Sequence, residues 1–115
     1  MNKFMFKGKT TADDKWIFSS HYESDVLGNV FIDDERVHPD SVGLFTGFYD
    51  EDSSSVYEGD ILTAHLSTVD VDLVIVWNID EGKFQANYLS GGKFSDLSQA
   101  KLNHWRVTGR VFDRQ

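Results

Sequence analysis

The chain has 115 residues, a formal net charge of −8 at pH 7 and no cysteine. This length fits one domain with a buried core, and the lack of cysteine excludes disulfides, thiolate metal sites and cysteine nucleophiles. No apolar run reaches the roughly 20 residues that a membrane-spanning helix needs, and the N-terminus lacks the apolar region of a signal peptide. We therefore expect a cytoplasmic protein that makes no membrane contact.

The negative charge is concentrated in the first half of the chain. Residues 1–60 contain 13 acidic and 5 basic side chains, whereas residues 61–115 contain 6 of each. Because an acidic protein repels phosphate backbones, non-specific nucleic-acid binding is disfavoured. The acidic half either keeps the protein soluble, which is the simpler interpretation, or forms a docking surface for a basic partner.

Short segments with a period of two residues predict a series of β-strands joined by turns. In chain order the predicted strands are residues 3–7 (with Phe4 and Phe6 on one face), 16–18, 26–27 and 30–32 around a two-residue turn at Gly28-Asn29, 44–49, 56–57, 61–66, 69–77, 83–88 and 103–112. Residues 37–40 are predicted to form a turn, and residues 50–55 an exposed loop.

The only helix candidate is residues 95–102, with Ser95 as its cap. Short connections between strands indicate an all-β, mostly antiparallel fold with at most one short helix near 95–102. Residues 59–112 have the size and strand rhythm of an SH3-like barrel element in the C-terminal half. One domain covers residues 1–115, and two subdomains, 1–57 and 58–115, are the alternative.

Two strands carry further information. Strand 69–77 presents Val69, Leu73 and Trp77 on one face, and its other face changes from aspartate to valine, so its far end should be buried on both sides, within the sheet or under a neighbouring subunit. The last strand carries basic residues of equal parity, which predicts one basic stripe: His104, Arg106, Arg110 and Arg114. Pairing of this stripe within the chain or between subunits is favoured over phosphate binding or an exposed face without a ligand.

Motifs for catalysis or metal binding are weak. The histidines lie far apart, without the paired spacing of metal ligands. Asp50-x-Asp52-x-Ser54 begins like a calcium loop, but Ser55 stands where glycine is needed and Ile61 where a bidentate glutamate is needed. Ser90-Gly91-Gly92-Lys93 lacks the glycine spacing of a phosphate loop. We expect no enzymatic activity, no catalytic residue, no metal and no cofactor.

One motif stands out in the middle of the chain. It consists of a glycine-flanked aromatic segment followed, across an acidic and serine-rich loop, by a turn before an apolar strand; its members are Gly43, Phe45, Thr46, Gly47, Tyr57, Glu58, Gly59 and Asp60. Structural roles explain these residues best: glycine permits positive φ, Asp60 can accept hydrogen bonds from nearby amides, and Tyr57 can tie the turn to the core.

This motif, the opening Lys3-Phe4-Met5-Phe6-Lys7 and the closing His104-Trp105-Arg106-Val107-Thr108-Gly109 together resemble the YopX-like proteins of phages and prophages. The resemblance implies a mostly β protein of a bacterial host's cytoplasm that tends to oligomerise and has no assigned activity or cofactor. With the uneven charge, it predicts a non-enzymatic, homo-oligomeric interaction or assembly module whose partners are other copies, or a phage or host protein. A regulatory protein that binds nucleic acid or a host factor is the alternative.

Overall fold

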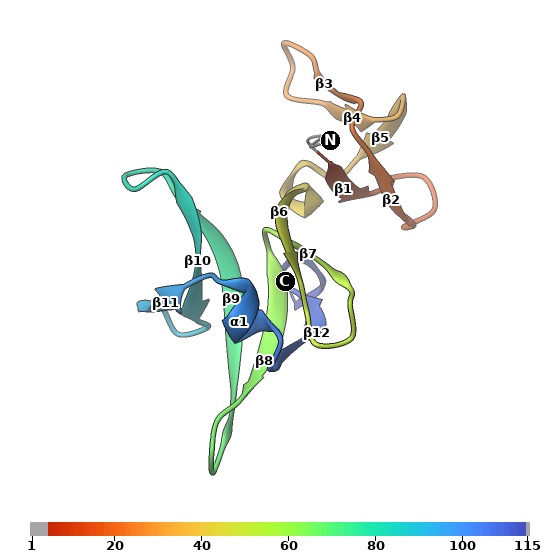
Figure 1. Cartoon of the computed structure of the whole chain (residues 1–115). Coiled ribbons are helices and arrows are strands. Elements are labelled where there is room, and N and C mark those ends of the chain that lie inside the picture. Colours follow the sequence, from red (N-terminus) through yellow and green to blue (C-terminus); the bar gives the residue numbers. More distant parts are fainter. Residues whose placement is uncertain (1–4, 115) are drawn as a thin grey trace. The chain divides into compact units, whose positions relative to one another are not determined.

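A computed structural model describes residues 5–114, and nearly all regular structure in it is antiparallel β-sheet (Figure 1). The predicted all-β class is confirmed, and residues 5–114 contain one short α-helix, as expected. The chain divides into two compact units, residues 1–45 and 46–115. Whether these units act as one domain, and whether residue 57 bounds a subdomain, stay predictions. None of the helices in the described part of the chain has the length and apolar character required to cross a membrane.

The first unit is built from short strands. Its elements are β1 (Phe6–Lys9), β2 (Trp16–Ser19), β3 (Tyr22–Ser24), β4 (Val30–Ile32), β5 (Glu35–Val37), the 3₁₀ turn η1 (Pro39–Ser41) and the start of β6 (Gly43–Tyr49). Strand β1 pairs with β2 and with the first residues of β6, and β3, β4 and β5 form a three-stranded sheet. Its core consists of Val30, Ile32 and Val37, with Phe6, Ile17 and Val42 packed against them.

Gly8 explains how β1 packs so closely on this core. A Cβ atom at Gly8 would lie only 2.9 Å from Cδ1 of Ile32 and 3.2 Å from Val37. Any side chain there would therefore push β1 away from the buried residues of β4 and β5.

Three predictions for this unit need correction. The first strand begins at Phe6 and runs to Lys9, and Lys3 and Phe4 lie outside the described residues. Residues 26–27 are not a strand but part of a longer turn between β3 and β4. Strand β5 was not predicted, and its last residue lies in the turn expected at residues 37–40; Asp33 and Asp34, at φ of +52° and +66°, form the two-residue turn into β5.

The second unit contains the larger sheet. Its elements are the rest of β6, β7 (Ser55–Tyr57), β8 (Asp60–His65), β9 (Asp70–Asn78), β10 (Lys83–Tyr88), β11 (Lys93–Asp96), α1 (Gln99–Leu102), β12 (Trp105–Arg110) and the 3₁₀ turn η2 (Phe112–Arg114). The strands are ordered β11-β10-β9-β8-β12, so the last strand returns to pair with the first strand of a meander. This curled order agrees with the expected barrel element, although β11 and β12 remain the two edges of the sheet.

One face of this sheet holds the core of the second unit. It contains Val56, Leu62, Ala64, Leu73, Ile75, Ala86, Leu102 and Trp105. The predicted apolar face of β9 is confirmed in its middle, where Leu73 and Ile75 are fully buried. The expectation of burial on both sides at the far end is wrong for Trp77, which is 45% exposed, whereas Val74 and Val76 are half-buried.

The helix is shorter than predicted and is capped by a different serine. The oxygen of Ser98, not Ser95, accepts a hydrogen bond from the backbone N–H of Lys101 (3.2 Å). Residues 93–96 instead extend as β11 and pair with β10.

Candidate functional site

The motif residues of the second unit surround a buried ion pair. Nη1 of Arg110 lies 3.0 Å from Oδ1 of Asp60, and both side chains are almost fully buried. The same Nη1 donates to the backbone oxygen of Glu58 (2.5 Å), and the other carboxylate oxygen of Asp60 accepts from the N–H of Tyr57 (2.8 Å). The Glu58-Gly59-Asp60 turn is therefore wrapped around the guanidinium.

Gly59 makes this close wrapping sterically feasible. Its φ is +88°, and a Cβ atom there would lie 3.1 Å from Nη1 of Arg110. Its N–H donates to the oxygen of Ile75, and its own oxygen accepts from the N–H of Val111. The ring of Tyr57 is buried beside the turn, and this burial, together with the charge of Asp60, raises the pKa of its phenol.

The glycine-flanked aromatic segment is also held by backbone geometry. Thr46 donates through its hydroxyl to the oxygen of Val56 (2.8 Å) and accepts from the N–H of Phe48 (3.1 Å). Gly47 has a φ of +87°, in the left-handed region. Gly43 is buried opposite Lys7 in the ladder, and the N–H of Phe45 bonds to the oxygen of Met5. These contacts hold the segment in place within the fold, and the structural role of the motif stays a prediction.

Residues 50–55 were predicted to form an exposed loop, and this is wrong for the side chain of Asp50. It is only 4% exposed; its Oδ1 accepts from the N–H groups of Asp52 (2.9 Å) and Ser54 (2.8 Å), and its Oδ2 from the N–H of Val107 (2.9 Å). The carboxylate thus closes the 50–54 loop and fixes it to β12. Sequence alone showed no signal for this distant acceptor.

The predicted basic stripe does not form one face. The register of β12 against β8 shifts between Val107 and Gly109, so Thr108 is an extra residue that changes the parity of the strand. Arg110 therefore turns to the core face and pairs with Asp60, whereas His104, Arg106 and Arg114 stay exposed. Internal pairing with the acidic half is thus found for Arg110; a contact of the other three with a partner stays a prediction.

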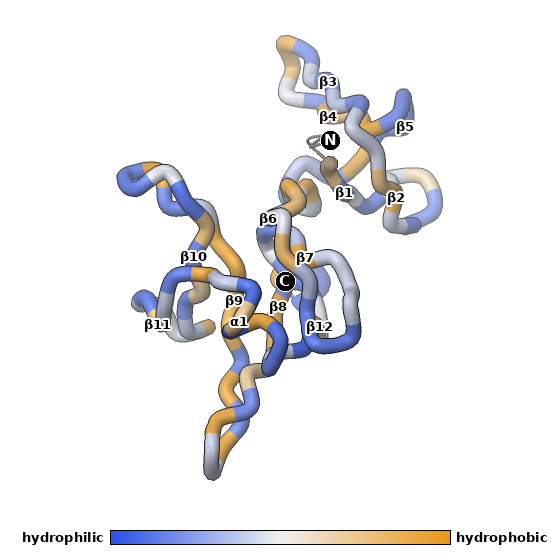
Figure 2. Tube along the Cα trace, viewed as in Figure 1, coloured by the Kyte–Doolittle hydropathy of each residue, from blue (hydrophilic) through white to orange (hydrophobic). Residues whose placement is uncertain are grey.

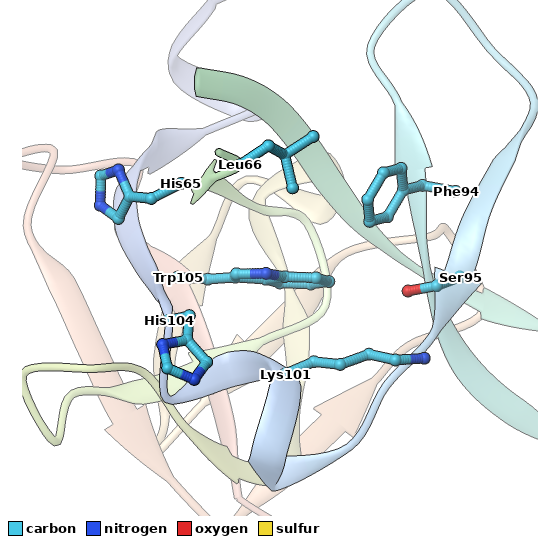
Figure 3. A pocket seen from close by; sticks show the side chains of 7 residues that line it. All are labelled: His65, Leu66, Phe94, Ser95, Lys101, His104 and Trp105. Atoms are coloured by element: carbon cyan, nitrogen blue, oxygen red, sulfur yellow. The ribbon is translucent and has the colours of Figure 1, made fainter. Parts of the chain in front are cut away.

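A cavity of about 460 Å³ opens on the second unit between the two edge strands of its sheet. It is lined by His65, Leu66, Phe94, Ser95, Lys101, His104 and Trp105 (Figure 3). Figure 3 shows the indole of Trp105 at its centre, between Leu66 and Lys101, with the ring of Phe94 across the cavity on β11. The ring centroids of Trp105 and Phe94 lie 5.9 Å apart in a T-shaped arrangement. This contact joins β12 to β11, the two edge strands of the sheet.

The polar groups of the cavity lie around this apolar centre. The ring nitrogens of His65 lie 3.1 Å from Asp70 and 3.3 Å from Glu51, and Nζ of Lys101 donates to the oxygen of Asp96 (3.1 Å). His104 is exposed. Apolar walls with a few polar side chains are typical of binding sites. Of the lining residues, sequence reasoning had singled out only His104 as a contact, because the cavity depends on the pairing of distant strands.

The first unit brings together a second group, which sequence spacing missed. His21, Glu23 and Asp34 offer ligand atoms within 4.8 Å of one another, and all three are exposed. Nε2 of His21 lies 2.8 Å from Glu23, and this hydrogen bond is the main cause that raises the pKa of His21. The contact between His21 and Glu23 is explained as a surface ion pair. The expectation that the protein has no dedicated metal site stays a prediction.

Comparison with known proteins agrees with the resemblance seen in the motifs. The family model described as YopX protein matches residues 1–114. No curated protein shows significant similarity to the chain. The family match indicates a phage-type protein, and it covers nearly the whole sequence, including both halves of the Asp60–Arg110 pair. The chain therefore belongs to the YopX family.

Proposed function

We propose that this protein is a phage or prophage accessory protein of the bacterial cytoplasm that acts without catalysis, as a homo-oligomeric interaction or assembly module. The observation that supports this most strongly is the cavity at Trp105, whose walls are aromatic and aliphatic. Such a site can accept an apolar side chain of another protein chain, and aromatic anchors in pockets dominate many protein interfaces.

Large apolar side chains exposed at turns support the same proposal. Val26 and Leu27 are 101% and 84% exposed, and Ile79 is 82% exposed. Single exposed apolar residues are common, whereas adjacent ones form a contiguous apolar surface of the kind that marks interaction sites. Figure 2 shows the hydrophobic stretch at the end of the β3–β4 turn.

The free energy gained when one apolar side chain enters the cavity is small, and this argues for more than one contact per copy. Burying a leucine side chain contributes about 1.5–3 kcal/mol, whereas association costs at least about 4 kcal/mol in lost freedom of motion. A single cavity contact would therefore be weak. A closed ring gives every copy two contacts and can be stable where one contact is not.

The test is the absolute mass in solution, measured by light scattering behind a sizing column over a range of protein concentrations, at low and high salt. A discrete multimer supports the proposal. If it loosens with salt, charged contacts contribute, and Arg106→Glu and Arg114→Glu, both at exposed positions, then show whether the remaining basic residues take part. A monomer at every concentration and both salts would refute self-assembly.

A second function is favoured by one specific observation. The cavity places the half-buried ring of Phe94 near the basic side chains Lys101 and His104, and an aromatic surface beside basic groups is the combination that binds single-stranded nucleic acid. The net charge of −8 opposes it. Fluorescence anisotropy with a labelled oligonucleotide at low salt distinguishes the two: binding that is lost in Lys101→Glu would favour a nucleic-acid regulator, and no binding would remove this alternative.

A further inference from the structure

The turn between β3 and β4 presents two aliphatic side chains fully to solvent. Val26 and Leu27 lie at its tip and are 101% and 84% exposed. Burial of aliphatic side chains is the main driving force of folding, yet these two contribute nothing to the core of the first unit. Their exposure is a cost unless another surface covers them.

This tip is ordered by its own hydrogen bonds. The carboxylate of Asp25 accepts from the N–H groups of Leu27 (3.0 Å) and Asn29 (2.9 Å) and from the side-chain amide of Asn29 (2.9 Å). Gly28 supplies a φ of +89°, and Nη2 of Arg36 donates to the Asn29 side chain (2.8 Å). A tip held in one conformation loses little entropy when it binds, so it is preorganised for recognition.

The cavity at Trp105 has the complementary properties. It is concave and apolar where the tip is convex and apolar, and its lining includes the basic side chains Lys101 and His104 and no acidic side chain. The hairpin region 22–36 that carries the tip is acidic overall: it contains one basic side chain, Arg36, and five acidic ones, Glu23, Asp25, Asp33, Asp34 and Glu35. The charges on the two surfaces therefore favour docking of one on the other.

We propose that the Val26–Leu27 tip of one copy docks into the Trp105 cavity of a second copy. This inference rests on the proposed self-assembly and specifies its contact. The contact is head-to-tail, since it joins two different surfaces, and repetition around a closed rotation gives a ring in which every tip and every cavity is filled.

Four variants at exposed or half-exposed positions test the contact by light scattering. Leu27→Asp removes the tip anchor, and its matched control is Ile79→Asp, because Ile79 is 82% exposed on another turn. Leu66→Asp places a negative charge in the cavity wall, and its control is Val69→Asp, at a residue of the same β8–β9 turn that does not line the cavity. Circular dichroism confirms that each variant is folded.

We expect Leu27→Asp and Leu66→Asp each to raise the dissociation constant of the multimer at least ~30-fold, and the controls to change it by less than about threefold. A multimer that survives either test variant would overturn the docking inference while leaving self-assembly intact. A wild-type monomer would instead refute the proposed function, so the two failures are distinguishable.

Mixing the two variants gives a second, independent measurement. A Leu66→Asp chain keeps its tip and a Leu27→Asp chain keeps its cavity, so the mixture can form one contact. In ¹⁵N-labelled Leu66→Asp chain, the amides of Val26, Leu27 and Gly28 should shift when unlabelled Leu27→Asp chain is added, and not when the Leu27→Asp/Leu66→Asp double variant is added. Equal shifts with both additions, or none with either, would overturn the inference.

Discussion

Replacing Arg110 with methionine removes the positive charge from the buried pair and keeps a flexible apolar stem. Asp60, which is fully buried, would then lose the guanidinium 3.0 Å away, while its carboxylate would still accept from the N–H of Tyr57. Removing one partner of a buried ion pair costs about 3–5 kcal/mol, because the remaining charge is left uncompensated in the interior. We expect Arg110→Met to lower the free energy of unfolding by this amount.

The cost is large compared with the whole stability of a small domain, which is about 5–15 kcal/mol. Arg106→Met is the matched control, since Arg106 lies on the same strand but is exposed, and it should change the free energy of unfolding by less than ~0.5 kcal/mol. Adding Asp60→Asn to Arg110→Met removes the uncompensated charge and should recover part of the loss.

Urea unfolding of the three variants, followed by circular dichroism, measures these differences. Equal losses for Arg110→Met and Arg106→Met would refute the role of the buried pair. A loss for Arg110→Met that Asp60→Asn does not reduce would show that the hydrogen bond from the guanidinium to the backbone oxygen of Glu58, rather than the charge left on Asp60, carries the stability.

Three further outcomes are expected. Gly59→Ala should cost about 1–3 kcal/mol in urea unfolding, because the residue has a φ of +88° and its new Cβ would lie 3.1 Å from Arg110. Asp50→Ala should cost about 2–4 kcal/mol in thermal unfolding, since N–H groups of the 50–54 loop and β12 lose their acceptor. The pKa of His21, measured by NMR, should lie above 6.5 and fall in Glu23→Gln, because the Glu23 hydrogen bond is the main cause of the shift. The stabilisation from a protonated His21 is then complete below the unfolded-state pKa and disappears as the pH rises through the raised folded-state pKa.

Each of these three variants has a matched control variant in the same chain. Gly82→Ala shares the positive φ (+67°) but has no atom within 4 Å of the new Cβ, so it should cost less than Gly59→Ala. Asp52→Ala, at an exposed position of the Asp50 loop, should cost less than about 0.5 kcal/mol. Asp34→Asn should move the pKa of His21 less than Glu23→Gln does, since Asp34 is the weaker cause. The reverse order in any pair would contradict the contact assigned to it.

The alternation of apolar residues was enough to predict the fold class and most strands. It works where one face of a strand is buried, as for Leu73 and Ile75 in β9. Prediction from alternation fails where a side chain, rather than the backbone, accepts the hydrogen bonds of a turn, because such bonds leave no periodic pattern in the sequence. The Asp25 carboxylate turns residues 25–29 into a loop, and the Asp33-Asp34 turn starts an extra strand.

The candidate sites were harder to predict, because they depend on register. One extra residue, Thr108, moved Arg110 from the predicted surface stripe to the core. The signal was present as Gly109, since an isolated glycine within a strand often marks a bulge. The Trp105 cavity carried no comparable signal, since its walls come from β8, β11, α1 and β12, and no short motif encodes that convergence.

The division of roles among these residues explains why family membership informs the fold more than the partner. The motif residues of the second unit are occupied by its internal contacts: Asp60 with Arg110, Gly59 against the guanidinium, and Thr46 with Val56. Residues committed in this way cannot change partners without a loss of stability. The proposed recognition would therefore depend on side chains that the scaffold leaves accessible, and the Leu27 tip and the wall of the Trp105 cavity satisfy that condition. A substitution at either place can change what the protein binds while the ion pair, and hence the fold, stays unchanged.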